Sequence, residues 1–263
     1  MRIDVLTVNH GTSRYAELLV ASFLRHHPDR SGVRFVVLDN CSPEIERLDR
    51  FRVDGIEVQQ TGYGERHILT THGEILRDAV LARPDCDAYL FVDSDVCFQA
   101  DGTLWGMAEE LTADSGLFAI QARWMGADGT EFFESVPSPL PHSYIREYIR
   151  SSPDAPLPDP LEYAVELRMT DRVHPFCVLV RNSPEFRKTV DYIGLSPGRV
   201  EAERGGRWWD TLGLMTQVMR THGKTWRRSA YGVLHFGSVS WDAQWAEEKA
   251  ALRDSLLRRY TEE

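Results

Sequence analysis

The sequence predicts an α/β fold, with a mixed but mostly parallel sheet and helices on both of its faces. Three observations support this prediction. Short apolar runs alternate with helical patterns through the first hundred residues. Polar clusters follow the apolar runs, as ligand-binding loops follow the strands of such sheets. At 263 residues, the chain is long enough for one large domain with a full core.

Four apolar runs in the first part of the chain are typical of strands, and a helix should follow each of the first three. The strands are expected at Ile3–Val8, Val33–Leu38, Ile56–Val58 and Ala88–Val92. Helical spacing predicts helices over about 14–25 and, after a glycine turn at 61–64, up to about residue 82. A helix should also start at Ser42-Pro43-Glu44, because a capping hydroxyl precedes a proline there.

The rest of the chain is less regular. Strands are expected at Leu117–Arg123 and Val173–Val180, and helices from Ser183 and over Leu212–Arg220. Residues 137–160 hold seven of the thirteen prolines, which predicts a long loop or lid. Beyond residue 240, an amphipathic helix should pack on its own domain, with a homo-oligomer surface as the alternative. Its apolar positions are Trp245, Leu252, Leu256 and Tyr260.

Composition excludes several classes of partner. With 40 acidic and 30 basic side chains and a net charge of -10, the protein should repel nucleic acid and anionic membranes. No apolar run approaches the roughly 20 residues of a membrane span, and the polar start Met1–Asp4 is unlike a signal peptide. The four cysteines are scattered, which favours reduced, mostly buried thiols over a zinc site or disulfides. We therefore expect a cytoplasmic protein.

Asp93-Ser94-Asp95 is the most informative motif. It ends the apolar run 88–92, so two carboxylates lie close together at the end of a strand. Such a pair persists most easily beside a cation, and hard oxygen ligands suit Mg²⁺ or Mn²⁺. These ions leave coordination positions for phosphate oxygens, which predicts a metal-diphosphate site. The alternative is that the two Asp residues only finish a strand and cap the next turn.

Polar clusters also end the three preceding strands. They are Asn9-His10, Asp39-Asn40 and the glycine turn at 62–64. Because the carboxyl ends of parallel strands meet at one edge of the sheet, we expect these clusters to converge with Asp93–Asp95 on a single crevice.

Three segments, IDVLTVNHGTSRYAELLVASFL, FVVLDNCS and LFVDSDV, resemble the opening strand-helix-strand and the DxD motif of GT-A fold glycosyltransferases, particularly the family-2-like group. The resemblance implies a Rossmann-like fold that binds a nucleotide-sugar donor. It assigns Thr7, Val8 and Asn9 to the base and ribose and Asp39 to the base edge. Asp93 would approach the ribose and the metal, Ser94 would also contact the donor, and Asp95 would ligate the metal.

The resemblance also implies roles for two residues in the second half. His235 ends an apolar run, where these enzymes often place a third metal ligand, although a structural histidine is the alternative. Asp210 precedes a predicted helix and would be the general base of an inverting transferase, although it could simply cap that helix. One departure concerns the Asn-rich stretch of the family, which appears here as Thr61–Gly64 and His72-Gly73.

The expected function is metal-dependent transfer of a sugar, with Mn²⁺ or Mg²⁺, from a nucleoside-diphosphate sugar, in particular a UDP-sugar, to a small-molecule, peptide or carrier-linked glycan acceptor. Residues 1–100 would bind the donor, 101–240 the acceptor, and 241–263 would form the terminal helix. Inversion is favoured, and retention stays open. The alternatives are a haloacid-dehalogenase-like phosphatase with Asp93 as phosphoryl acceptor, or a nucleotide-sugar-binding module without catalysis.

Overall fold

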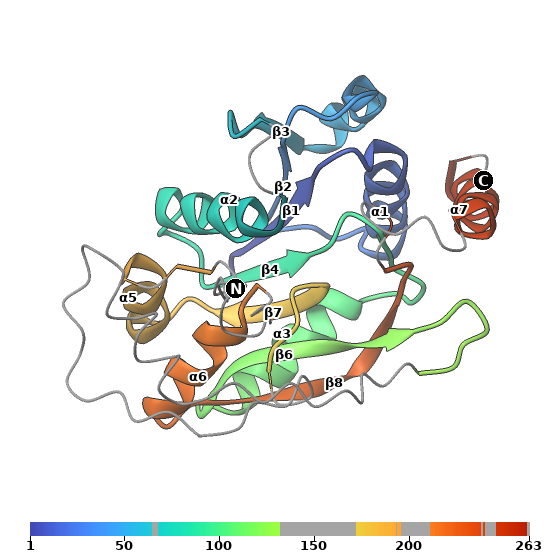
Figure 1. Ribbon diagram of the computed structural model, residues 1–263. Helices are drawn as coiled ribbons and strands as arrows, with labels where there is room; N and C mark the ends of the chain where they lie inside the picture. Colours follow the sequence, from blue (N-terminus) through green and yellow to red (C-terminus); the bar gives the residue numbers. More distant parts are fainter. Residues whose placement is uncertain are drawn as a thin grey trace, which may run out of the picture.

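A computed structural model of the protein describes residues 1–64, 68–131, 172–192, 194–195, 211–237, 239 and 246–261. The described strands form one sheet in the order β3-β2-β1-β4-β7-β6-β8-β5 (Figure 1). Their bounds are β1 Ile3–Asn9, β2 Val33–Asp39, β3 Ile56–Gln60, β4 Ala88–Val92, β5 Val96–Cys97, β6 Leu117–Met125, β7 Cys177–Arg181 and β8 Thr225–His235.

Helices cover both faces of this sheet. The described helices are α1 Ser13–His26, η1 Ile45–Asp54, α2 Ile68–Ala82, α3 Thr103–Ala113, α5 Pro184–Tyr192, α6 Gly213–Thr221 and α7 Ala246–Thr261. Successive side chains of β4 enter opposite cores: Leu90 joins the apolar cluster with α1 and α3, and Phe91 joins the cluster with α2, α5 and α6. The predicted α/β fold class, a mixed sheet with helices on both faces, is confirmed.

Strand direction decides where the functional side chains meet. Strands β1, β2, β3 and β4 pair in parallel, so they all end at the same edge of the sheet. Strand β7 is antiparallel to both β4 and β6, and β8 is parallel to β6. Strands β6 and β8 therefore end at that same edge, to which the arrows of β1, β4 and β6 point in Figure 1.

The segment after β2 differs from the expectation. The prediction of a regular helix that begins at Ser42-Pro43-Glu44 is wrong, because residues 45–54 form the 3₁₀ helix η1. The Ser42 hydroxyl does not cap a helix but accepts the N–H of Gly11 at 2.9 Å. Cys41 and Glu44 have positive φ angles of 58° and 57°, which lead the chain away from helical geometry before η1 begins.

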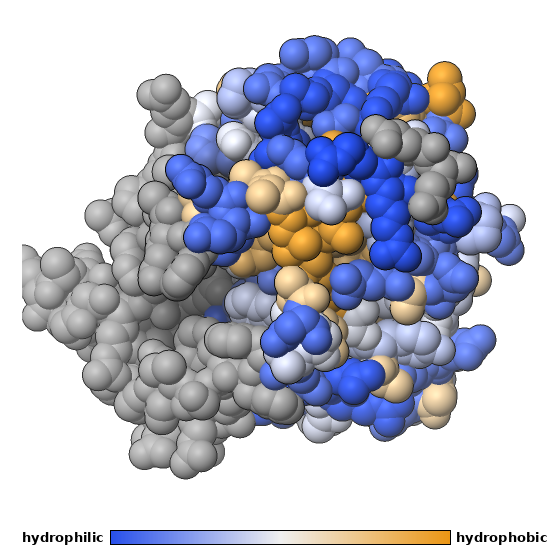
Figure 2. Space-filling model, turned by 90° about the vertical axis from the view of Figure 1, so that its right-hand side faces the viewer, coloured by the Kyte–Doolittle hydropathy of each residue, from blue (hydrophilic) through white to orange (hydrophobic). Residues whose placement is uncertain are grey.

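Helix α7 packs beside α1 and runs in the same direction, as the pairs Tyr15–Arg253 and His26–Tyr260 show (Figure 1). Leu252, Leu256 and Tyr260 pack as predicted, against a cluster that includes Leu18 and Phe236, whereas Trp245 lies outside the described residues. Figure 2 faces this side of the molecule and shows hydrophilic residues around one apolar area. Among the described residues, no helix combines the length and the apolar character that a bilayer crossing requires.

Candidate metal centre

The two aspartates of the DxD motif meet His235 at the carboxyl edge of the sheet. The Nε2 atom of His235 lies 3.1 Å from Oδ1 of Asp95 and 3.6 Å from Oδ2 of Asp93. One ligand atom from each of the three residues lies within 4.8 Å of the others. The structure thus brings together the three residues that the sequence singled out as metal ligands.

Pairing between β5 and β8 creates this arrangement. After β4 ends at Val92, the chain turns at Asp93–Asp95 and forms β5, in which Val96 pairs antiparallel with His235. The N–H of Phe236 also donates to the carbonyl of Asp95 at 3.1 Å. Backbone hydrogen bonds on both sides therefore fix the separation of the Asp95 and His235 side chains.

Aromatic rings hold the His235 imidazole in place. Phe176 stacks on it at 5.1 Å between ring centroids, and Trp124 lies at 4.3 Å on a tilted plane. The indole N–H of Trp124 donates to the carbonyl of His235 at 2.9 Å. Gly237 has a φ of +67°, and a Cβ there would lie 3.0 Å from the Trp124 ring, so only glycine leaves this packing undisturbed. The His235 side chain is thus held in one orientation without a bound ion.

The charges of the cluster are strongly coupled. Burial opposes a charged imidazole, but the carboxylates of Asp95 and Asp93 outweigh it and raise the pKa of His235. Burial likewise favours a neutral Asp95, but His235 outweighs it and lowers the pKa of this carboxyl. The site therefore favours a positive charge between two carboxylates, whether on the imidazole or on a bound cation.

The donor set suits a divalent cation. Two carboxylates and one imidazole match the ligands that Mn²⁺ accepts, and Mg²⁺ also binds through carboxylates. The Asp95 and His235 side chains are 7% and 5% exposed, whereas that of Asp93 is 24% exposed and faces an accessible side. Nδ1 of His235 is buried and has no hydrogen-bond partner in the described part of the chain. The cluster could hold an ion with one side open.

The ends of β1, β2 and β4 are linked by side-chain hydrogen bonds, as the sequence predicts. The Asn9 amide donates to Asp39 at 2.9 Å and to the hydroxyl of Ser13 at 3.1 Å. The Thr12 hydroxyl bonds to Asn9 at 2.9 Å and to the Ser94 hydroxyl at 2.7 Å. A continuous polar network therefore runs from the end of β2 to the DxD motif.

The neighbouring loop closes the same edge. The Asn40 amide donates to the carbonyl of Gly64 at 2.9 Å and accepts from the Thr61 hydroxyl at 3.0 Å. Thr7 is completely buried in β1, and its hydroxyl has no hydrogen-bond partner among the residues described; Val8 is 8% exposed. The four strand ends therefore meet at one edge of the sheet, as predicted, and the single crevice there stays a prediction.

His72 is a site residue that the sequence did not single out as functional. Its Nε2 atom lies 3.8 Å from Oδ1 of Asp93, and its Nδ1 atom lies 3.0 Å from the Thr211 hydroxyl. His72 therefore links the start of α6 to the DxD motif. His72 lies in the first part of α2, and the one available signal was the resemblance, which gives His72-Gly73 as part of the counterpart of the family's Asn-rich stretch. Asp210, the predicted general base, lies outside the described residues.

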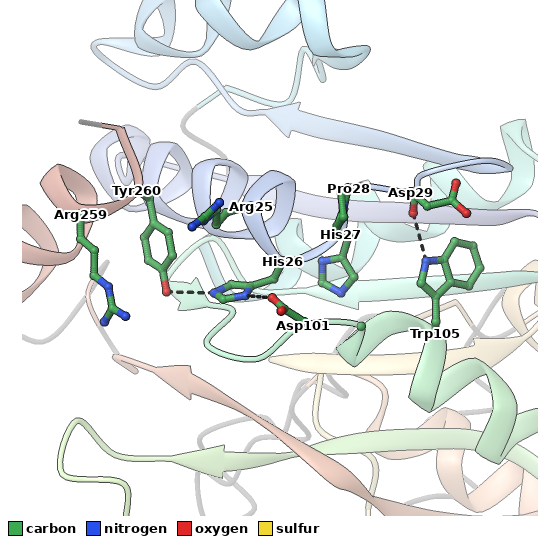
Figure 3. A pocket seen from close by; sticks show the side chains of 10 residues that line it. Arg25, His26, His27, Pro28, Asp29, Asp101, Trp105, Arg259 and Tyr260 are labelled. Atoms are coloured by element: carbon green, nitrogen blue, oxygen red, sulfur yellow. Dashed lines mark hydrogen bonds and ion pairs between the residues drawn. The ribbon is translucent and has the colours of Figure 1, made fainter. Parts of the chain in front are cut away.

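A separate pocket of about 660 Å³ lies at the other end of α1 (Figure 3). Its lining comes from the last turn of α1, the first turn of α3 and the end of α7. His26 bridges Asp101 at 2.7 Å and the Tyr260 hydroxyl at 3.2 Å, and the Trp105 indole donates to the carbonyl of Asp29 at 3.1 Å. The pocket and the Asp93–Asp95–His235 cluster lie near opposite ends of α1, whose 14 residues span about 20 Å.

Solved glycosyltransferase structures share this fold at low sequence identity. TarS residues 1–349 from S. aureus matches with a TM-score of 0.56 and 14% identity, over 99% of this chain and 65% of that one. The mannosyltransferase PcManGT from Pyrobaculum calidifontis, in complex with GDP-Man and Mn²⁺, has a TM-score of 0.58 and 13% identity, over 98% and 63%.

Glucosyl-3-phosphoglycerate synthase from Mycobacterium tuberculosis, in complex with phosphoglyceric acid, matches with a TM-score of 0.53 and 13% identity, over 98% of this chain and 79% of that one. This chain spans 65% of the TarS fragment and 63% of PcManGT, so it is shorter than both. No protein-family model matches the sequence, and neither does any curated protein. The chain has the GT-A fold that these glycosyltransferases share.

Proposed function

We propose that the protein is a metal-dependent glycosyltransferase that uses a nucleoside-diphosphate sugar. The observation that carries this proposal is the Asp93–Asp95–His235 cluster at the carboxyl edge of a GT-A sheet. Structures with the same fold are described in complex with UDP-GlcNAc, with UDP-glucose and Mn²⁺, and with GDP-Man and Mn²⁺. Among these donors, a UDP-sugar is our preferred candidate.

Asp93, Asp95 and His235 would hold Mn²⁺ or Mg²⁺. When bound, such a cation supplies Lewis-acid stabilisation of the departing diphosphate. The partly exposed carboxylate of Asp93 faces the donor side, whereas buried Asp95 and His235 anchor the site. The rings of Trp124 and Phe176 keep water from one side of the imidazole.

The nucleoside would lie against the ends of β1 and β2. Asp39 is fully buried and accepts from the Asn9 amide at 2.9 Å, from the Gln60 amide at 2.8 Å and from the N–H of Ser42 at 3.2 Å. These bonds fix one orientation of the carboxylate, which still has lone pairs for the N–H of a base. Thr7 and Val8 would complete the base and ribose site, and Ser94 would contact the donor beside the metal.

Residues 1–100 would form the donor half of the protein and residues 101–240 the acceptor half, which would bind a small-molecule, peptide or carrier-linked glycan acceptor. Asp210 would remove the proton from the attacking hydroxyl of the acceptor, with inversion at the anomeric carbon. Its neighbour Thr211 bonds His72 at 3.0 Å, and His72 lies 3.8 Å from Asp93, which supports a position of this segment near the metal.

Replacement of Asp210 by Asn should lower kcat by roughly 10²- to 10⁴-fold, because this is the usual contribution of a general base. The KM for the donor should change little. Initial rates at varied donor and acceptor concentrations measure both constants. An increase in donor KM at unchanged kcat would assign Asp210 a binding role instead.

The phosphatase alternative requires Asp95 to act as an acid on a leaving group. The Asp95 side chain is only 7% exposed and lies against His235 at 3.1 Å, which favours a ligand role. Hydrolysis of p-nitrophenyl phosphate, compared with Mn²⁺-dependent hydrolysis of nucleotide sugars, separates the two activities.

The direct test of the proposed function is a thermal-shift panel of UDP- and GDP-sugars with Mn²⁺. A bound donor raises the melting temperature by linkage, and a concentration 100 times Kd stabilises by about 2.7 kcal/mol. We expect one nucleotide class to raise the melting temperature with Mn²⁺ and to lose most of this effect with EDTA. Equal melting curves with every nucleotide sugar would contradict the proposal.

A further inference from the structure

Two cationic side chains of α7 lie at the metal end of α1. Lys249 and Arg253 are one helical turn apart, so they project from the same side of α7. Lys249 is half-buried, and Arg253 is only 7% exposed. The other arginines near the end of this helix, Arg258 and Arg259, are exposed. A buried arginine on a surface helix requires a nearby anion, because desolvation of an unpaired charge is costly.

Lys249 is close to the metal cluster. Its ammonium group donates to the carbonyl of Gly237 at 2.8 Å, and Gly237 is two residues beyond His235 in the chain. The ammonium group of Lys249 therefore lies at the backbone segment that directly follows His235.

Arg253 lies on the same side of the cluster. Its guanidinium group is 4.9 Å from the ring centroid of Tyr15, and this ring packs edge-on against Phe236 at 5.1 Å. Arg253 also acts on Glu44, in the loop after β2, whose pKa is lowered mainly by Arg47. Its position is therefore between the DxD end of the sheet and the loop beside Asp39.

Few anions of the described structure balance these cations. The one carboxylate within ion-pair distance of Arg253 among the described residues is Asp254, which accepts from Nε at 2.8 Å and lies 2.7 Å from Nη2, and its side chain is 41% exposed. Lys249 has no ion pair with a carboxylate in the described ranges. Meanwhile, Asp93 and Asp95 together would balance a divalent cation. A diphosphate at the cluster would therefore add negative charge that the metal and its ligands leave uncompensated.

We propose that Lys249 and Arg253 bind the diphosphate of the nucleotide donor, so that helix α7 completes the donor site. This inference rests on the proposed function. When the bond between the anomeric carbon and the diphosphate oxygen breaks, the electron pair stays on that oxygen. Both cations then stabilise the charge that develops on the leaving group. A helix that the sequence indicates only as a packing element thus carries part of the binding site.

Calorimetry with Mn²⁺ and two ligand series tests this inference. The series are UDP, UMP and uridine, and GDP, GMP and guanosine. Replacement of Lys249 by Met should lower the affinity for the diphosphate roughly 10- to 100-fold, as for loss of a charge-assisted hydrogen bond. Affinity for the nucleoside should not change, and that for the monophosphate should fall less. Lys249→Arg should recover most of the loss.

The matched control is Arg258→Met, which removes an exposed cation from the same helix and should leave all affinities as in the wild type. Arg253→Met should resemble Lys249→Met, and Arg253→Lys should retain most of the affinity. Circular dichroism and melting curves establish that each variant is folded. Should Arg253→Met not fold, the Lys249 series and Arg253→Lys decide the question.

Two results would overturn the inference. Equal losses for diphosphate and nucleoside in Lys249→Met would show that Lys249 only holds α7 in place. Unchanged diphosphate affinity in Lys249→Met and Arg253→Met would remove both side chains from the site. If the wild type bound neither UDP nor GDP, the proposed function would fail together with the inference. If the wild type binds one of them and the variants lose no affinity for it, only the inference fails.

Discussion

Two buried histidines lie near opposite ends of α1, and their surroundings differ. His27 is 1% exposed, its Nδ1–H donates to the carbonyl of Phe23 at 2.9 Å, and its Nε2 accepts the N–H of Leu104 at 3.0 Å. Both ring nitrogens are satisfied by neutral groups, and burial lowers its pKa to about 4. His235 is also buried, but two carboxylates face it and raise its pKa.

These surroundings distinguish His27, which supports packing, from His235, which belongs to a candidate metal site. At His27 every polar atom of the ring has a backbone partner, so the neutral ring serves the packing of α1 on α3. At His235 two acids face one imidazole, so the cluster favours a positive charge between the carboxylates, either on the imidazole or on a bound cation. The predictions that follow test this distinction, from the largest expected effect to the smallest.

The largest effect is expected for Asp95→Asn. Loss of this carboxylate should weaken Mn²⁺ binding by at least about 100-fold, because removal of a direct ligand should cost more than removal of an outer-shell partner. Metal-dependent activity should be abolished. Calorimetric Mn²⁺ titration measures the affinity, and circular dichroism establishes that the fold is retained. Asp101→Asn, beside His26 at the other end of α1, is the matched control and should bind Mn²⁺ as the wild type does. Full activity of Asp95→Asn would exclude the proposed site.

The second effect concerns stability at low pH. Folding lowers the pKa of His27 from 6.5 to about 4. Between these pH values the unfolded chain therefore binds a proton at His27 and the native state does not. The contribution of neutral His27 is complete above pH 6.5 and falls by roughly 3 kcal/mol as the pH approaches 4. Urea unfolding of wild type and His27→Gln should show a difference in unfolding free energy that shrinks over this range. A difference independent of pH would contradict the structural account of His27.

The third effect tests the aromatic support of His235. Trp124→Leu removes the indole hydrogen bond to the His235 carbonyl and the ring contact at 4.3 Å. Mn²⁺ affinity should fall roughly 10- to 100-fold, as for other outer-shell partners of a metal ligand. Trp105→Leu removes the corresponding bond to Asp29 at the distant pocket and should leave Mn²⁺ affinity unchanged. Equal losses in both variants would point to a general loss of packing.

The smallest effect concerns the pocket end of α7. Tyr260→Phe removes a hydroxyl that donates to the carbonyl of Phe98 at 3.0 Å and lies 3.2 Å from His26. We expect a loss of about 1 kcal/mol in unfolding free energy and a melting temperature lower by about 2–4 °C. Mn²⁺ and nucleotide affinities should not change, because this contact is remote from Lys249 and Arg253. A large drop in nucleotide affinity would show that the two ends of α7 are coupled.

Local pattern was sufficient to predict that polar side chains gather at one edge of the sheet. Each polar cluster directly follows an apolar strand, and parallel strands place their ends together, so Asp93, Asp95, Asn9 and Asp39 could be expected at one place. The prediction of a helix start at residues 42–44 was wrong because the Ser42 hydroxyl accepts the N–H of Gly11, which belongs to a distant part of the chain. Local capping signals do not reveal such a competing partner.

Contacts between distant segments determined the remaining features. His235 lies beside Asp95 because β5 pairs with β8, and the two-residue strand β5 is too short to show a pattern of its own. His72 comes from α2, Trp124 from β6 and Phe176 from the segment before β7, and no motif connects them in the sequence. For α7, the apolar spacing predicted a packed helix, but not that Lys249 would bond the carbonyl of Gly237 or that Arg253 would lie over the ring of Tyr15.

The most direct test of the account is the electron paramagnetic resonance signal of Mn²⁺ titrated with wild-type protein, without nucleotide and then with UDP or GDP. The account predicts that the signal of free Mn²⁺ decreases as the protein binds the ion, and that one diphosphate strengthens this binding. A free-ion signal that stays unchanged at every protein and nucleotide concentration would contradict a metal centre at Asp93, Asp95 and His235.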